Sequence, residues 1–207
     1  RLLKEQLSSV LPIEDQNFGK FNLGYYSTRM DPNMKDSPRE NMEDNLYECK
    51  KYAKEFGESS PNLLMYGSTG LGKTFLSTCI ADAVSARGFS VAYDTAINII
   101  AAYETIKFGT GDGAAAAERA ARYERADLLI IDDMGTEMGT AFTVSALYNL
   151  INNRLMAHRP MIVNTNLLPD ELKKRYSPAV ASRLLGEFKQ LRFFGDDIRM
   201  LKSRMQR

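Results

Sequence analysis

The chain has 207 residues, of which 44% are hydrophobic and 26% are charged, as in an ordinary globular domain with a buried core. Its net charge of +1 excludes the strong overall positive field of a dedicated nucleic-acid binder. No apolar run approaches the roughly 18 residues of a membrane span, so we expect a cytoplasmic protein without membrane contact. Two cysteines, Cys49 and Cys79, and one histidine, His158, match no metal-ligand spacing, which argues against a zinc site.

Residues 1–40 are predicted to form a lead-in or linker. They show no sustained hydrophobic period and are interrupted by Pro12, Pro32 and Pro38. Because the chain begins with Arg1 rather than methionine, we expect the lead-in to continue from an N-terminal part that this sequence lacks. Aromatic residues between Phe18 and Tyr26 leave two interpretations open. They pack the lead-in against the following domain, or they contribute to a ligand pocket.

From residue 41 onward, segments with helical spacing alternate with short apolar runs. The helical segments are residues 41–56, 73–87, 96–108, 114–125, 141–157, 169–176, 179–188 and 198 onward. The apolar runs predict strands over residues 62–66, 89–93, 128–131, 161–163 and 191–194. This alternation predicts one α/β domain over residues 41–207, with a parallel sheet flanked by helices on both faces.

The segment Gly67–Thr74 reads Gly-Ser-Thr-Gly-Leu-Gly-Lys-Thr and fits the P-loop pattern at every fixed position. It follows a predicted strand and opens a predicted helix, where backbone N–H groups and the helix N-terminus can bind phosphate. Lys73 is expected at the β- and γ-phosphates of ATP, and the Thr74 hydroxyl is expected on Mg²⁺. The predicted ATP-binding residues are Gly67, Ser68, Thr69, Gly70, Leu71, Gly72, Lys73, Thr74 and Phe75.

The apolar run 128–131 leads directly into Asp132 and Asp133. An acid at the carboxyl end of a buried strand lies beside the P-loop in a doubly wound sheet. Asp132 is therefore predicted to reach Mg²⁺ through a water, and Asp133 to polarise the water that attacks ATP. Without the P-loop, two acids at a strand end would be read as solvated loop residues. With it, the chain is predicted to be an ATPase, and the short side chain of Asp133 indicates slow turnover.

The order of these features resembles the AAA+ family of P-loop NTPases, and within it the bacterial replicative-helicase loaders of the DnaC/DnaI type. The resemblance covers roughly Phe18 to Arg199. Its more specific segments are Phe18–Phe21, Ile131–Glu137, Ile162–Leu167, Ser182–Leu184 and Gly195–Arg199. It implies an AAA+ fold with little or no separate lid domain.

The resemblance also implies roles for further polar residues. Asn166 matches the sensor between the γ-phosphate and the attacking water, and Asn164 is the rival for this role. Arg183 matches the arginine that reaches into a neighbouring subunit's site, although sequence alone favours a surface arginine. Arg199 resembles a late arginine that senses nucleotide within its own subunit, and it could equally face solvent.

An arginine supplied by a neighbour implies an ATP-bridged oligomer, inside which the family binds single-stranded DNA. Possible DNA contacts are Lys107, Lys173, Lys174, Arg175, Lys202, Arg204 and the stacking residue Tyr103, each of which could instead be an ordinary surface or core residue. The first hypothesis is an ATP-dependent loader of the replicative DNA helicase in replication initiation. The alternative is a transposition helper ATPase of the insertion-sequence type. Its members typically carry a tryptophan and an Asp-Glu pair, whereas this chain has no tryptophan and reads Asp132-Asp133.

Overall fold

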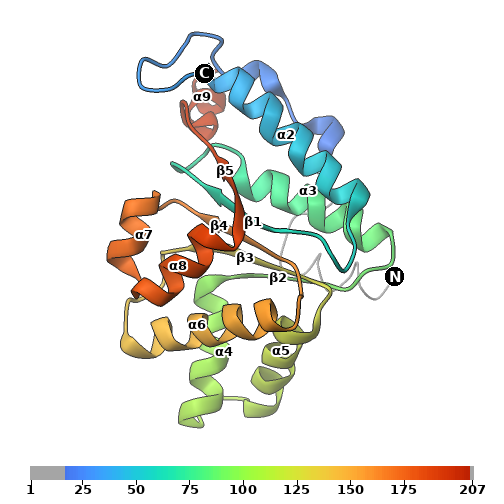
Figure 1. The fold of residues 1–207 in the computed structure, drawn as a ribbon, viewed down its shortest axis with the longest axis vertical. Coiled ribbons are helices and arrows are strands. Elements are labelled where there is room, and N and C mark those ends of the chain that lie inside the picture. The colour runs from blue at the N-terminus through green and yellow to red at the C-terminus, as the bar shows by residue number, and fades with distance from the viewer. Residues whose placement is uncertain (1–16, 206–207) are drawn as a thin grey trace.

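A five-stranded parallel sheet forms the centre of the computed structural model, which describes residues 17–205 (Figure 1). The strands lie in the order β2-β3-β4-β1-β5, and every neighbouring pair is parallel. Their bounds are β1 Asn62–Tyr66, β2 Val91–Thr95, β3 Leu128–Met134, β4 Met161–Thr165 and β5 Phe188–Arg192. The predicted parallel α/β sheet is thus confirmed. Parallel strands need helical crossovers, and these crossovers cover both faces.

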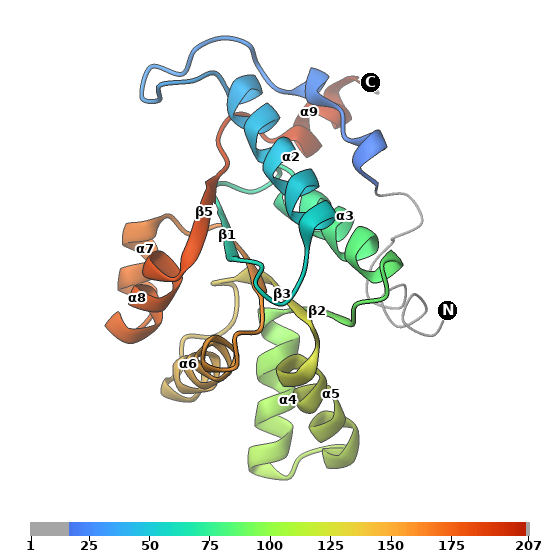
Figure 2. The same cartoon turned by 45° about the vertical axis from the view of Figure 1, so that its right-hand side comes forward.

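Two helices cover one face of the sheet and five cover the other (Figures 1 and 2). The first face carries α2 (Pro38–Glu55) and α3 (Lys73–Ala86). The second carries α4 (Ala96–Phe108), α5 (Gly113–Arg125), α6 (Ala141–Met156), α7 (Pro169–Arg175) and α8 (Pro178–Gly186). Each face buries its own apolar cluster, because successive strand residues point to opposite sides. After β5 the described chain continues as α9 (Ile198–Met205).

Several predicted boundaries differ from the structure. Helix α2 begins at Pro38, inside the predicted lead-in, because Ser37 and Glu40 form a reciprocal capping box. The first 16 residues of that lead-in lie outside the described residues. Strand β2 lies two residues later than predicted, and β3 extends to Met134, which brings both predicted carboxylates into the strand.

The predicted last strand begins three residues too late and ends two residues too late. Strand β5 spans Phe188–Arg192 rather than 191–194, and the helix predicted over 179–188 ends at Gly186. The cause is the position of β5 at the sheet edge, where Lys189, Gln190 and Arg192 are exposed and obscure the apolar pattern. The buried Phe193 follows the strand, and its N–H donates to the carbonyl of Tyr66. No helix in the described range is both long and apolar enough to cross a bilayer.

One buried arginine stabilises the end of the sheet where β3 and β4 begin. Arg154 of α6 is 1% exposed, and its guanidinium donates to the carbonyl oxygens of Tyr123, Glu124, Ala126 and Pro160 at 2.8–3.1 Å. Burial lowers the pKa of Arg154 to about 10. Pattern analysis did not detect this residue, because its partners are main-chain carbonyls that leave no mark in the sequence.

The variant Arg154→Met should lower the free energy of unfolding by about 2–3 kcal/mol, because it leaves buried carbonyls without a donor. Urea unfolding would measure this loss. Arg159→Met is the matched control, since Arg159 donates to the carbonyl of Arg125 in a more exposed position. An equal decrease in the free energy of unfolding in both variants would show that the buried hydrogen bonds of Arg154 contribute no more to stability than the exposed one of Arg159.

Candidate nucleotide site

The segment between β1 and α3 forms a phosphate cradle whose glycines are required by close backbone contacts. Gly67, Gly70 and Gly72 have φ values of 136°, 71° and 98°, which side-chain-bearing residues rarely adopt. A Cβ at Gly67 would lie 1.9 Å from the carbonyl oxygen of Phe193. The loop therefore has the conformation of a P-loop. It ends at the N-terminus of α3, where free backbone N–H groups can bind an anion.

Lys73 lies inside this loop as a buried cation. It is 6% exposed, and its Nζ donates to the carbonyl oxygens of Gly67 at 2.6 Å and Ser68 at 2.7 Å. Burial lowers its pKa to about 8, and the charges of Asp133 and Asp132 oppose that shift. A buried ammonium group among N–H groups and a helix N-terminus is suited to bind phosphate.

Asp132 lies beside the loop at the end of β3 and is only 4% exposed. Its Oδ1 accepts hydrogen bonds from Thr74 Oγ1 at 3.3 Å and Asn164 Nδ2 at 2.9 Å. Its Oδ2 accepts one from the Tyr93 hydroxyl at 2.6 Å. The structure thus brings together Thr74 and Asp132, the two residues predicted to hold metal. A carboxylate and a hydroxyl next to a phosphate cradle fit Mg²⁺, a hard cation that prefers oxygen ligands.

Asp133 differs from its neighbour because it faces the open cleft. It is exposed, lines the same cleft as Lys73, and has a left-handed backbone with φ of 51°. Burial of the carboxyl and the charge of Asp132 raise its pKa, while Lys73 and Arg199 oppose the rise. A carboxylate placed here can accept a proton from water near the phosphate cradle.

The variant Asp133→Asn should bind ATP as tightly as the unmodified chain and hydrolyse it about 10²-fold more slowly, at the lower end of general-base contributions. Asparagine is the best replacement, because it has the same size and tolerates a positive φ. Single-turnover hydrolysis, with ATP affinity as the control, measures the effect. An unchanged rate would remove Asp133 from catalysis.

A cleft of about 380 Å³ opens between the P-loop and two elements from the ends of the described chain. One is the lead-in, where the Tyr26 hydroxyl donates to the Leu71 carbonyl at 2.9 Å. The Phe21 ring stacks on Tyr26 and meets the edge of Phe75. The other is α9, whose Ile198 N–H donates to the Gly70 carbonyl. The lead-in aromatics therefore both pack on the domain and line the cleft, so the two interpretations of them are compatible.

Sequence analysis missed part of this wall. The cleft residues that the sequence did not place at the nucleotide are Lys20, Asn22, Thr136, Ile198 and Lys202, the last of which was predicted as a possible DNA contact. The ammonium group of Lys202 lies 4.9 Å from the centroid of the Tyr25 ring, which ties α9 to the lead-in. The aromatic lead-in and the family match of Arg199 were the signals for this wall. Its other residues left no local pattern, because they come from the two ends of the described chain.

The structure separates the remaining predicted residues into two groups. Asn166 and Arg199 line the cleft. Asn164 is buried beneath it, where its Nδ2 donates to Ser77 and Asp132. Arg183 lies on α8, outside the residues that line the cleft, and donates to Asn152 Oδ1 at 2.7 Å. The roles of these residues stay predictions.

The fold, the P-loop and the adjoining carboxylates define a P-loop ATPase of the AAA+ class. The family model described as "IstB-like ATP binding protein" matches residues 48–203. The chain therefore belongs to the family of IstB-like ATP-binding proteins. The predictions of an AAA+ fold and of an ATPase are confirmed at this level.

Curated relatives of different kinds match this chain. An insertion-sequence ATP-binding protein of Mycobacterium tuberculosis is 26% identical over 129 residues, covering 62% of this chain and 50% of the relative. The replicative helicase loader DnaC of Escherichia coli is 25% identical over 140 residues, covering 67% of this chain and 56% of the relative. The chain spans about half the length of the curated relatives it matches, so their full activities do not transfer automatically.

Solved structures support the fold. A crystal structure of the DnaC helicase loader superposes with a TM-score of 0.66 at 17% identity, covering 86% of this chain and 98% of that one. DnaI superposes with the same TM-score at 16% identity, covering 91% and 93%. AMPPCP-bound DnaA from Aquifex aeolicus gives a TM-score of 0.65 at 24% identity, covering 81% and 52%. At such identities these likenesses establish the fold alone.

Proposed function

We propose that this chain is the ATPase part of a switch that loads the replicative DNA helicase onto single-stranded DNA in replication initiation. The observation that carries the proposal is the contact between the lead-in and the P-loop, through Tyr26 and Leu71 and through Phe21 and Phe75. A partner-binding part attached N-terminally would connect through this lead-in. ATP in the cleft would then favour one arrangement of the lead-in and so change partner affinity.

The proposed chemistry uses residues from the P-loop and from the carboxyl ends of β3 and β4. Lys73 binds the β- and γ-phosphates of ATP, and Thr74 and Asp132 hold Mg²⁺, which neutralises phosphate charge when bound. Asp133 polarises the attacking water, with Asn166 between that water and the γ-phosphate. Lys73, Thr74, Asp133 and Asn166 line one cleft, and Asp132 lies buried next to it in contact with Thr74, which supports this assignment.

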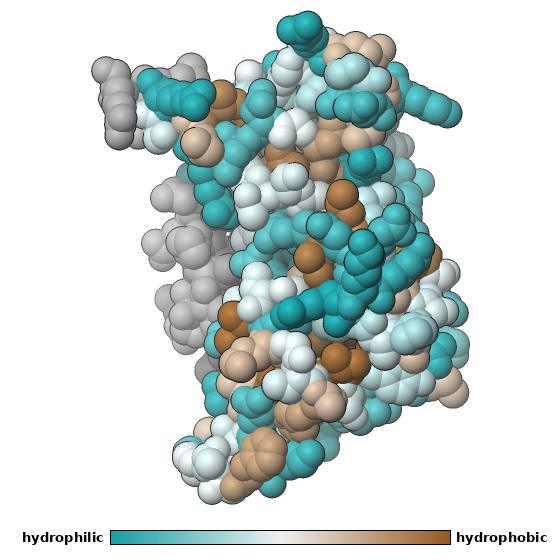
Figure 3. All heavy atoms as spheres, turned by 90° about the vertical axis from the view of Figure 1, so that its left-hand side faces the viewer, coloured by the Kyte–Doolittle hydropathy of each residue, from teal (hydrophilic) through white to brown (hydrophobic). Residues whose placement is uncertain are grey.

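The position of Arg183 supports an oligomeric active form. It lies on α8, away from its own cleft, and a neighbouring subunit could receive it. Figure 3 views the side of the molecule that is on the left in Figure 1, where α7 and α8 lie, and hydrophilic and hydrophobic residues are interspersed there. Interfaces that form and dissociate have this mixed character, whereas obligate interfaces are more apolar.

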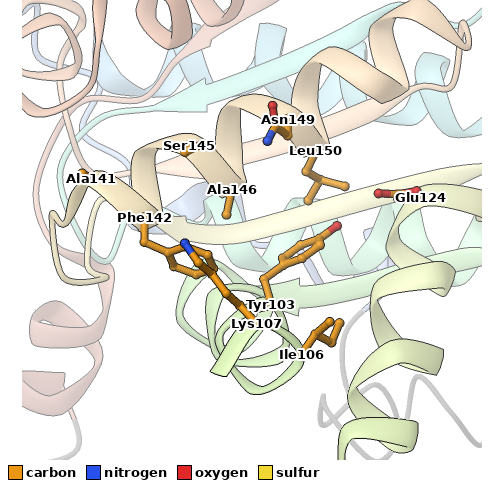
Figure 4. A pocket seen from close by; sticks show the side chains of 10 residues that line it. All are labelled: Tyr103, Ile106, Lys107, Glu124, Ala141, Phe142, Ser145, Ala146, Asn149 and Leu150. Carbon is orange, nitrogen blue, oxygen red and sulfur yellow. The ribbon is translucent and has the colours of Figure 1, made fainter. Parts of the chain in front are cut away.

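A groove between α4 and α6 supports single-stranded DNA binding (Figure 4). It has a volume of about 580 Å³, and Tyr103 and Lys107 of α4 face Phe142 of α6 across it. The Lys107 ammonium lies 4.6 Å from the Phe142 ring centroid, and the neighbouring Phe108 is 61% exposed. The exposed Phe108 ring and the half-buried Tyr103 and Phe142 rings could stack unpaired bases, and the Lys107 ammonium could bind their phosphates.

Other basic candidates are less favourably placed for DNA. Lys173 pairs with Asp170 at 3.0 Å, and Arg175 donates to the carbonyl of Glu137. Lys202 lines the nucleotide cleft rather than the groove. Lys107 borders an aromatic groove and is favoured over these three residues, so its groove is the DNA site that we propose.

The deciding experiment is ATP-dependent association of the full-length protein with the replicative helicase of its own organism. Size-exclusion chromatography with ATP or ADP, with and without single-stranded DNA, would show the complex. We expect a complex whose stability depends on the nucleotide. Confirmed ATP binding with no helicase complex would contradict the loader function.

A transposition helper ATPase is the second candidate, favoured by the family model and by the mycobacterial insertion-sequence relative. Its test is the same chromatography with an insertion-sequence transposase of the same organism. Association with a transposase and not with the helicase would select this function.

A further inference from the structure

Tyr93 is a buried tyrosine that reaches the predicted metal carboxylate from the neighbouring strand. It lies on β2 and is 2% exposed. The register of β2 and β3 pairs Tyr93 with Ile130 and Thr95 with Asp132. Tyr93 therefore lies opposite Ile130, two residues before Asp132. Because side chains alternate along strands, the side chains of Tyr93 and Asp132 point to the same face of the sheet. This placement allows the 2.6 Å hydrogen bond from the Tyr93 hydroxyl to Asp132 Oδ2.

The two oxygens of Asp132 have different partners. Oδ1 accepts from Thr74 and Asn164 and from the backbone N–H of Asp133. Oδ2 has Tyr93 as its hydrogen-bond donor within the described part of the chain. Removal of the Tyr93 hydroxyl would therefore leave Oδ2 buried without a donor. A carboxylate in that state would rotate or change its hydrogen bonds, because an unpaired buried oxygen is costly.

We propose that Tyr93 is a positioning residue for Asp132: its hydroxyl fixes the carboxylate in the orientation that turns Oδ1 toward Thr74, so that both can hold one Mg²⁺. The inference rests on the proposed metal role of Thr74 and Asp132. Groups that orient a metal ligand through a hydrogen bond typically change metal affinity about 10–100-fold when removed. The tyrosine acts through Asp132 and has no contact with substrate in this assignment.

The chain provides a matched control on the other face of the same sheet. The Tyr123 hydroxyl donates to Asp94 Oδ2 at 2.7 Å, and both residues are buried. This bond has the same chemistry as the bond between Tyr93 and Asp132. Tyr123 packs in the apolar cluster beneath α4, α5 and α6, away from the P-loop. Tyr123→Phe therefore reports the structural cost of losing such a bond without changing the metal site.

The test measures affinity for the non-hydrolysable analogue AMPPCP by calorimetry, first in EDTA and then across a Mg²⁺ titration, with the full chain. Tyr93→Phe should leave affinity in EDTA unchanged and raise the Mg²⁺ concentration needed for full affinity by about 10-fold. Tyr123→Phe should change neither. Thermal unfolding of both variants shows whether their folding losses are equal, which separates positioning from stability.

The variant Asp132→Asn separates failure of this inference from failure of the metal assignment. It should abolish the Mg²⁺ dependence of AMPPCP binding. Suppose that Asp132→Asn has that effect. The positioning role of Tyr93 is then overturned if Tyr93→Phe does not shift the Mg²⁺ titration. It is also overturned if Tyr123→Phe shifts the titration as much as Tyr93→Phe does. If Asp132→Asn leaves the Mg²⁺ dependence intact, the metal assignment falls and this inference falls with it.

Discussion

Lys73→Ala should lose ATP binding, with an affinity decrease on the order of 10²–10³-fold. Truncating one partner of a buried, hydrogen-bonded charge pair costs about 2–5 kcal/mol. Lys73 would form such a pair with bound phosphate, because its buried ammonium is enclosed by the loop that would hold the phosphates. Calorimetric titration with ATP and Mg²⁺ measures the loss directly.

The control for this variant is Lys107→Ala, which removes a lysine from the groove between α4 and α6. It should bind ATP normally. Lys73→Ala should also remain folded, because burial already disfavours the charged form and lowers the pKa of Lys73 to about 8. Thermal unfolding verifies this point. Normal ATP affinity in a folded Lys73→Ala protein would end the assignment of Gly67–Thr74 as a P-loop.

The P-loop could be predicted because its determinants lie within eight consecutive residues. Its glycines are needed where the backbone is left-handed, and its lysine follows directly in the same turn. The buried strand before Asp132 was recognisable for the same reason, since a continuous apolar run predicts a strand covered on both faces. Local sequence therefore predicted the phosphate cradle and both carboxylates.

The supporting contacts could not be predicted, because they join residues that are distant in the chain. Tyr26 reaches Leu71, Tyr93 reaches Asp132, and α9 returns to Gly70. The contact of Tyr93 depends on the pairing of β2 with β3, and the other two depend on how both ends of the described chain fold back onto the P-loop; apolar periodicity encodes neither. The choice between Asn164 and Asn166 was open in the sequence for a related reason. Their side chains differ in burial, and that difference follows from packing against Ser77 and Asp132.

The last strand illustrates the limit of pattern analysis. The run Leu191–Phe194 looked like a strand because it is apolar and aromatic, whereas β5 begins at Phe188 and includes three exposed polar residues. An edge strand makes ladder hydrogen bonds on one side only and tolerates such residues. Phe193 is buried although it lies outside the strand, because its backbone carbonyl packs directly against Gly67 of the P-loop.

Arg183→Ala should retain ATP affinity in the isolated subunit and lose the activity of the assembled protein by about 10³–10⁵-fold, as for arginine fingers supplied by a partner. The observed environment offers a competing explanation. Arg183 donates to Asn152 and lies 6.0 Å from the ring centroid of Tyr148, so it could simply stabilise the packing of α8 on α6. Asn152→Ala removes the same hydrogen bond and keeps the arginine, and it should therefore retain activity.

Mixing two inactive variants tests directly whether Arg183 acts in a neighbouring subunit. In an oligomer of Arg183→Ala and Lys73→Ala subunits, some sites combine an intact P-loop with an intact arginine from the adjacent subunit. Activity should therefore reappear on mixing, although neither variant is active alone. Arg199→Ala provides the contrast, because Arg199 lines its own cleft and should weaken ATP binding in a single subunit. If Arg183→Ala weakens binding in the same way, or if mixing restores nothing while both variants still assemble, the arginine does not act across the interface.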